Sequence, residues 1–360
     1  MAALEDGKTL LLLKPRGFCA GVVRAIDIVR IALEAFGPPI YVRKEIVHNR
    51  FVVEELQGKG AIFVDSVEEV PNGERVIYSA HGVSPEVREA SEHRKLRVID
   101  ATCPLVTKVH VEAVKFAKEG YSLILIGHRD HDEVIGTLGE APIVTQVVGS
   151  PEEVASLTLP DPTRVAYLTQ TTLSLDETKD IIAALRERFP HIKGPAAQDI
   201  CYATENRQVA VKQVASDADL LLVVGSDNSS NSNRLVEVAR NLGTSSHLID
   251  SFQNIKAEWL DGVKTIALTA GASAPECLVE EVVEFLGTRG FKNVKEVEVM
   301  PENVRFGLPP EIVEAIASAP TQAQKKMKAR GDLILKIPPA RAATVPMAPL
   351  KVMTGASARR

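Results

Sequence analysis

Residues 14–24 read KPRGFCAGVVR and join an apolar run to an amphipathic segment. The run before them, residues 10–13, consists of four leucines and is typical of a buried strand. Pro15 and Gly17 end this strand, and apolar residues then recur with helical spacing to about residue 36. Cys19 therefore stands at the first turn of a predicted helix. Unpaired backbone N–H groups and the helix dipole favour the thiolate there, and thiolate is the form that binds metals or attacks electrophiles.

The same order of strand, cysteine and helix recurs twice. Residues 96–100 are expected to form a strand that leads to Cys103, with Pro104 at the first position of the next helix. Cys201 precedes a third helical stretch. A lone cysteine is more often a small buried hydrophobic residue. Three cysteines in the same local setting, each near the start of a domain-sized unit, instead suggest three ligands that converge on one metal centre.

The composition limits the classes of protein to which this chain can belong. The chain has 360 residues, of which 45% are hydrophobic and 25% charged, which is typical of a globular protein with two or three domains. We find no signal peptide and no apolar run near the roughly 20 residues that span a bilayer. Four cysteines without CxxC pairs fit a reducing compartment. We therefore expect a cytoplasmic protein without a membrane partner.

Predicted strands and helices alternate along most of the chain, which favours an α/β fold with mostly parallel sheets. The expected units are residues 1–103, 104–198 and 199–310, followed by a basic tail at 311–360. Residues 318–360 carry nine Lys or Arg and one Asp and have little hydrophobic periodicity, so we expect the tail to be disordered. The rest of the chain is acidic, which argues against a nucleic-acid partner.

Polar segments follow six of the predicted strands. In open parallel sheets ligands bind beyond the carboxyl ends of the strands, so these segments are candidates for one site. Any one of them alone is more simply a solvated loop with helix caps. Together they offer many hydrogen-bond donors to a phosphorylated anion, and Glu133 is a candidate proton donor if burial raises its pKa. The segments are residues 45–49, 79–82, 127–133, 169–172, 225–233 and 269–274.

With these motifs in view, the sequence resembles the 4-hydroxy-3-methylbut-2-enyl diphosphate reductase family over about residues 11–308. The family catalyses the last step of the methylerythritol phosphate route to isoprenoids. The motifs that carry the resemblance are PRGFCAGV around Cys19, VHNR around His48, SAHGV around His81, DATCPLV around Cys103, TQTTLS around Thr171, DICYAT around Cys201, NSSNSNRL around Ser229, Ser230 and Asn231, and TAGASAP around Ser273.

The resemblance implies a trefoil of three α/β domains around a [4Fe–4S] cluster, with Cys19, Cys103 and Cys201 holding three irons and the fourth open to substrate. It implies that Thr171 places the substrate hydroxyl and that Glu133 supplies protons. The implied reaction is reductive dehydroxylation to isopentenyl and dimethylallyl diphosphate, with electrons from a ferredoxin or flavodoxin-type donor. The residues that it assigns to the diphosphate are His48, His81, His131, Ser229, Ser230, Asn231 and Ser273.

The chain departs from the family pattern at residues 131–133. The family often has His-Pro-Glu there, whereas this chain has Asp132 between His131 and Glu133, which places a second carboxylate beside the expected proton donor. Cys277 lies outside the cysteine motifs and is expected to be structural.

Two other functions fit parts of the pattern. One is a non-catalytic [4Fe–4S] redox sensor or a protein that binds a phosphorylated ligand, and the other is a transferase with a cysteine nucleophile. A sensor needs neither Glu133 nor Thr171, so these two residues favour the reductase.

Overall fold

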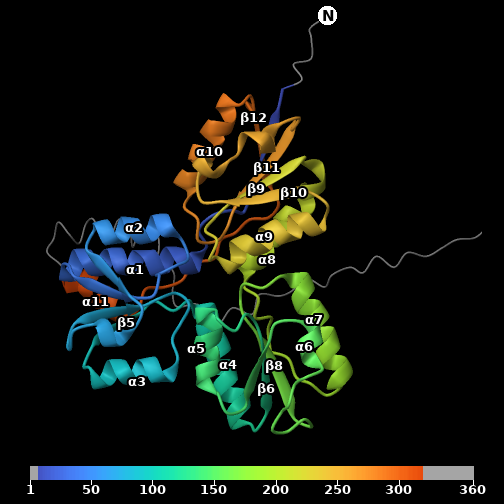
Figure 1. Cartoon of the computed structure of the whole chain (residues 1–360). Coiled ribbons are helices and arrows are strands. Elements are labelled where there is room, and N and C mark those ends of the chain that lie inside the picture. The colour runs from blue at the N-terminus through green and yellow to red at the C-terminus, as the bar shows by residue number, and fades with distance from the viewer. Residues whose placement is uncertain (1–6, 319–360) are drawn as a thin grey trace, which may run out of the picture.

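The computed structural model describes residues 7–318, and it has three lobes, each built on one sheet (Figure 1). The strand orders are β10-β9-β11-β1-β12, β3-β2-β4-β5 and β7-β6-β8. Every strand pair within the described residues is parallel. Strands β6, β8 and β9 are buried along their whole length, as expected when helices cover both faces of a parallel sheet. The predicted α/β class with mostly parallel sheets is thus confirmed.

The first lobe contains the four-stranded sheet and the helices around it. Helix α1 carries its buried apolar stripe against this sheet, and one core cluster joins the two. The elements of this lobe are α1 (Ala20–Phe36), β2 (Ile40–Arg43), α2 (Arg50–Gly58), β3 (Ala61–Val64), a 3₁₀ turn (Val67–Glu69), β4 (Arg75–Tyr78), α3 (Pro85–His93) and β5 (Arg97–Asp100).

The second lobe contains the three-stranded sheet, with separate apolar clusters on its two faces. Its elements are α4 (Pro104–Lys118), β6 (Ser122–Ile126), α5 (Asp132–Glu140), β7 (Thr145–Val148), α6 (Pro151–Val154), β8 (Val165–Thr169) and α7 (Leu175–Arg188). The third lobe contains the five-stranded sheet. Its elements are β1 (Thr9–Lys14), α8 (Tyr202–Val214), β9 (Leu220–Val224), α9 (Ser230–Asn241), β10 (Ser245–Ile249), β11 (Thr265–Ala270), α10 (Glu276–Thr288), β12 (Asn293–Glu298) and three 3₁₀ turns (Ala215–Asp217, Phe252–Asn254 and Ala257–Leu260).

The N-terminal strand lies in a different lobe from the one expected. Strand β1 pairs with β11 and β12, so that Thr9 lies opposite Thr265 and Asn293. The expected unit of residues 1–103 therefore does not coincide with one lobe, because its first strand completes the sheet of the third. The strand-to-helix turn at Cys19 connects these two lobes.

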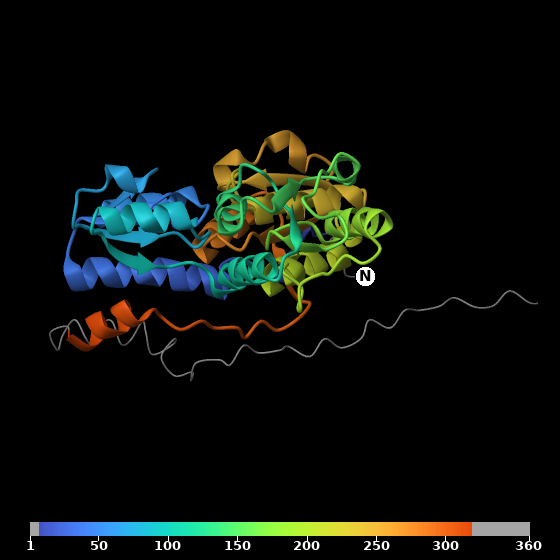
Figure 2. The same ribbon diagram turned by 90° about the horizontal axis from the view of Figure 1, so that it is seen from below.

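The chain after β12 corrects a second expectation. It runs along one side of the molecule from the third lobe to the first and ends in α11 (Pro310–Ser318), beside α1 (Figure 2). Ile312 and Ile316 are buried in the core cluster of the first lobe. Residues 311–318 are therefore not a disordered tail. They belong to an amphipathic helix whose apolar side packs against the first lobe. The rest of the expected tail lies outside the described residues.

Within residues 7–318, no helix has the length and apolar character that crossing a membrane would require.

Candidate active site

The three predicted metal ligands meet at the junction of the lobes. Cys19, Cys103 and Cys201 are the N-cap residues of α1, α4 and α8, and their side chains line one cavity. Gly21 leaves room for the sulfurs, because a Cβ there would lie 2.8 Å from the Sγ of Cys103 and 3.8 Å from the Sγ of Cys19. An all-cysteine donor set around such a space fits a soft metal or an iron–sulfur cluster.

The thiols of Cys103 and Cys201 are less acidic than their positions at helix N-termini predict. Burial and the neighbouring Cys19 raise the pKa of Cys103 to about 12 and that of Cys201 to about 11. The hydrogen bond from the Thr204 N–H to the Cys201 Sγ, 3.4 Å long, opposes this shift without cancelling it. For Cys103 and Cys201, desolvation therefore outweighs the bias toward thiolate that a helix N-terminus gives. A bound metal reverses that balance, since it deprotonates the thiols that it binds.

Two buried arginines, which the sequence did not point to, tie the cysteine turns together. Arg207 on α8 donates to the Gly17 carbonyl at 2.7 Å, two residues before Cys19, and pairs with Glu302 in the segment after β12. Arg24 on α1 donates to the Thr102 carbonyl at 3.0 Å, next to Cys103, and to the Gly307 carbonyl at 2.7 Å. An arginine inside the buried stripe of a predicted helix is the signal that could have marked Arg24.

Three histidines from three loops form a cluster beside the cysteines. The rings of His48 and His81 stack with centroids 4.0 Å apart, and the ring of His131 meets them edge-on at 5.4 and 5.8 Å. Burial and the nearby His48 lower the pKa of His131 to about 3 and that of His81 well below its usual value. The Nδ1 of His131 accepts the Glu133 N–H, so its Nε2 carries the proton and can donate to an anion.

Glu133 and Thr171 form a buried pair between the cysteines and the histidines. Only 2% of Glu133 is exposed. Its carboxyl group accepts the Thr171 N–H at 2.6 Å and lies 3.0 Å from the Thr171 Oγ1. Burial raises the pKa of Glu133 to about 7, and the two hydrogen bonds from Thr171 limit the rise. A carboxyl group with this pKa can hold a proton at neutral pH and release it to a bound molecule.

The third lobe contributes hydroxyl and amide groups from the start of α9 and from the loop after β11. Ser229 is the N-cap residue of α9, and its Oγ lies 3.4 Å from the Oγ of Ser273. The Oγ of Ser230 donates to the Thr172 carbonyl, and Asn231 accepts the Ala272 N–H. These residues surround a helix N-terminus, which favours an anion.

All the predicted site residues line the same cavity, whereas Cys277 is exposed on α10 and is not among its lining residues. The structure thus brings together what the sequence placed in separate loops. The twelve residues are Cys19, His48, His81, Cys103, His131, Glu133, Thr171, Cys201, Ser229, Ser230, Asn231 and Ser273.

A family model and similar curated proteins point to the same family. The model of the family described as LytB protein matches residues 10–287. A protein of Acidothermus cellulolyticus named 4-hydroxy-3-methylbut-2-enyl diphosphate reductase is 53% identical over 90% of this chain and 93% of its own length. A protein of Streptomyces coelicolor with the same name is 55% identical over 86% of this chain and 91% of its own.

A solved structure agrees with these relatives. The E-1-hydroxy-2-methyl-but-2-enyl-4-diphosphate reductase from Plasmodium falciparum superimposes with a TM-score of 0.84 and 42% identity, covering 86% of this chain and 98% of that one. Because the family model matches well over half of the residues, the chain belongs to the LytB protein family.

Proposed function

We propose that this protein reduces 4-hydroxy-3-methylbut-2-enyl diphosphate to isopentenyl and dimethylallyl diphosphate. The reaction takes two electrons and two protons, breaks the allylic C–O bond and releases water. The observation that carries the proposal is the cavity itself, where three cysteine thiols, a buried carboxyl group of raised pKa and three histidines converge. The names of the relatives and of the solved structure support the same reaction.

Cys19, Cys103 and Cys201 are the residues that would hold a [4Fe–4S] cluster, one per chain. Three ligands from the protein leave one iron open, and the bound cluster would supply electrons and a Lewis acid for the substrate oxygen. The fit rests on the all-sulfur donor set and on the space at Gly21.

Glu133 is the proposed proton donor. The hydroxyl of Thr171 is hydrogen-bonded to its carboxyl group, so a substrate hydroxyl placed beside Thr171 would lie within reach of the proton. Transfer of that proton to the departing oxygen completes a water molecule, and the second proton ends on the carbon skeleton. Exclusion of solvent raises the pKa of this carboxyl group to about 7, so that a large fraction of it carries the proton at neutral pH.

The opposite side of the cavity would bind the diphosphate. The Nε2–H of His131 and the hydroxyl group of Ser229 are donors there, with the N-terminus of α9 behind them. The Ser273 hydroxyl donates to the His48 carbonyl at 2.9 Å and would turn toward the diphosphate when it binds. His48, His81, Ser230 and Asn231 complete the proposed set. We assign the donors by geometry and by the resemblance of their motifs to those of the family.

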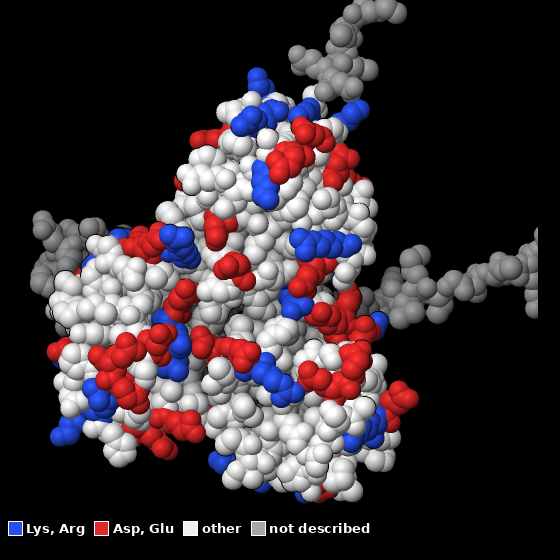
Figure 3. All heavy atoms as spheres, in the orientation of Figure 1, with Lys and Arg blue, Asp and Glu red and all other residues white. Residues whose placement is uncertain are grey.

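The electron donor is proposed to be a ferredoxin or a flavodoxin-type protein of the cytoplasm. On the face of the molecule seen in Figure 3, acidic and basic side chains are interspersed around the gap between the lobes. A patch of a single sign is not evident there, so we name the donor by class.

Product analysis tests the proposal. Protein purified without oxygen is assayed for iron and sulfide, then given the substrate with dithionite and a viologen mediator. We expect about four irons per chain and formation of both five-carbon diphosphates. If the cluster-loaded protein binds the substrate without converting it, the proposed reductase activity is refuted, and a redox sensor or a protein that binds a phosphorylated ligand is favoured.

A further inference from the structure

We propose that the cluster-loaded, substrate-free protein binds one divalent transition-metal ion of the zinc class between His48, His81 and Asp132, and that this ion competes with the diphosphate. The binding part of this inference is independent of turnover, and the competition rests on the proposed function.

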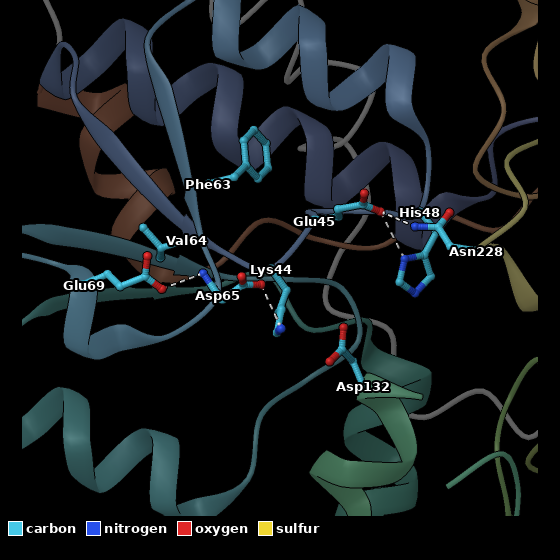
Figure 4. Close-up of a pocket in the computed structure, with 9 residues that line it drawn as sticks. All are labelled: Lys44, Glu45, His48, Phe63, Val64, Asp65, Glu69, Asp132 and Asn228. Carbon is cyan, nitrogen blue, oxygen red and sulfur yellow. Dashed lines mark hydrogen bonds and ion pairs between the residues drawn. The ribbon is translucent and has the colours of Figure 1, made fainter. Parts of the chain in front are cut away.

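The three side chains already lie close together. Each offers one ligand atom, and these atoms lie within 4.8 Å of one another. Ligand atoms around a tetrahedral zinc with bonds of about 2.0–2.2 Å lie roughly 3.3–3.5 Å apart, so the three side chains must move closer together. The stacked rings of His48 and His81 must also tilt so that a lone pair of each points at the ion. His48 and Asp132 both line a hollow of about 360 Å³, and Figure 4 shows Asp132 next to the ring of His48.

A second carboxylate, that of Glu45, contacts the ring nitrogen of His48 that faces away from the proposed metal. The Glu45 Oε2 lies 3.3 Å from the His48 Nδ1 and also accepts a hydrogen bond of 2.8 Å from the Asn228 side chain (Figure 4). A carboxylate that holds one nitrogen of an imidazole orients the other nitrogen and makes it a better ligand, which is the usual arrangement behind metal-binding histidines. With Nδ1 facing Glu45, Nε2 is the nitrogen left for a metal.

His81 has a similar support, and His131 does not. The Nδ1 of His81 lies 3.3 Å from the Ser79 Oγ, which leaves Nε2 for the site. The Nδ1 of His131 accepts the Glu133 N–H, so its Nε2 is protonated and cannot bind a metal in that state. The geometry therefore separates two histidines that can act as ligands from one that donates to an anion.

The ligand set points to a particular class of ion. Two imidazoles and one carboxylate suit zinc and the other late first-row divalent ions, whereas magnesium and calcium prefer oxygen ligands throughout. Three protein ligands leave at least one position of a tetrahedral ion open. Because His48 and His81 are also proposed diphosphate ligands, the metal and the substrate would exclude one another.

Zinc binding is measured on anaerobic, cluster-loaded protein by equilibrium dialysis at buffered free zinc, with zinc and iron counted in the same sample. We expect one zinc per chain in addition to an unchanged iron content, which excludes replacement of iron at the cysteines. Asp132→Asn should abolish this zinc. Glu45→Gln should weaken its binding about 10–100-fold, the usual effect of losing a carboxylate behind a ligand.

Asp65→Asn is the matched control. Asp65 lines the same hollow, but it is exposed and pairs with Lys44 at 2.9 Å, so zinc binding should be unchanged. Equal zinc content in the wild type and in Asp132→Asn, or a loss of zinc in Asp65→Asn, would overturn the site.

The competition is tested separately by steady-state kinetics at fixed free zinc. Zinc should raise the KM for the substrate and leave kcat unchanged in the wild type, and it should have no effect in Asp132→Asn. A fall in kcat at unchanged KM would contradict competition at this position. A protein that binds zinc as expected but has no reductase activity would refute the proposed function and retain the metal site.

Discussion

Glu133 is the residue on which the proposed chemistry depends most directly. It is buried, and Thr171 contacts both of its carboxyl oxygens. Glu133→Gln keeps the size and the hydrogen bonds of the side chain but removes its proton. We expect turnover to fall roughly 10²–10⁴-fold, the scale of losing a positioned general acid, while cluster content and substrate binding persist.

The measurement is steady-state kinetics under argon with dithionite and a viologen mediator. Glu54→Gln is the control, since Glu54 is exposed on α2 and pairs with Arg50. Near-normal turnover in Glu133→Gln would remove this residue from its proposed role.

The same carboxyl group predicts a pH dependence. Burial raises the pKa of Glu133 from 4.5 to about 7, so the protonated form is lost as the pH rises through 7. At saturating substrate, kcat should be highest below this pKa and should fall about tenfold per pH unit above it. A profile of kcat against pH checks this, and Glu133→Gln should lack the step at pH 7.

Glu133 also makes the stability of the folded protein depend on pH, and this stability, like kcat, should decrease as the pH rises. Between about pH 4.5 and pH 7 the folded protein holds a proton on Glu133 that the unfolded chain has released. The free energy of unfolding contributed by this group therefore decreases as the pH rises through that window. Denaturant unfolding of the wild type and of Glu133→Gln at pH 5 and pH 8 should show the difference. An equal pH effect in both proteins would mean that another group is responsible.

At the scale of elements, the segment after β12 holds two of the cysteine turns in place. Arg207 is 1% exposed at its side chain and contacts Glu302 as well as the Gly17 and Ala203 carbonyls. Removal of one partner from a buried ion pair costs about 3–5 kcal/mol, because the other charge is left uncompensated. Glu302→Ala should therefore lower the unfolding temperature and speed iron release to a chelator.

Glu298→Ala, on the exposed face of β12, is the matched control and should behave as the wild type. Iron release at the wild-type rate from Glu302→Ala would show that the cysteine turns do not depend on this segment.

Helix α11 makes a separate prediction about stability. Ile312 is fully buried against the first lobe, whereas Val313 is 38% exposed. Ile312→Ala should cost about 2–5 kcal/mol in the free energy of unfolding, as for other large-to-small changes in a core. Val313→Ala should change it by about 0.5 kcal/mol or less. Denaturant unfolding compares them, and equal stability of the two variants would contradict the packing of α11 on α1.

At the scale of the whole molecule, the basic charge after Ser318 contrasts with the acidic remainder of the chain. We expect removal of residues 319–360 to leave cluster content and turnover with a small-molecule reductant unchanged. If these residues attract an acidic ferredoxin, turnover with that donor should fall on truncation, and salt should reduce the difference by screening. Loss of turnover with dithionite after truncation would instead assign these residues to the catalytic body.

Local physical chemistry was sufficient to predict much of the fold, the three cysteine turns and the polar loops that form the site, whereas the resemblance to a family singled out the individual substrate-binding residues. Apolar periodicity marked most helices and strands, and proline and cysteine at helix starts marked the turns of Cys19, Cys103 and Cys201. These features depend on neighbours within a few residues, so they can be predicted from a single sequence. Polar residues after parallel strands likewise pointed to one edge of each sheet, and all twelve predicted site residues line the same cavity.

Only the tertiary structure decided which lobe each segment joins and how acidic the site groups are. The pairing of β1 with β11 and the path of residues 299–318 depend on backbone hydrogen bonds and apolar contacts between distant segments, which no local pattern specifies. The thiols of Cys103 and Cys201 likewise have raised pKa values because desolvation, which depends on what surrounds them, outweighs the helix position that the sequence shows.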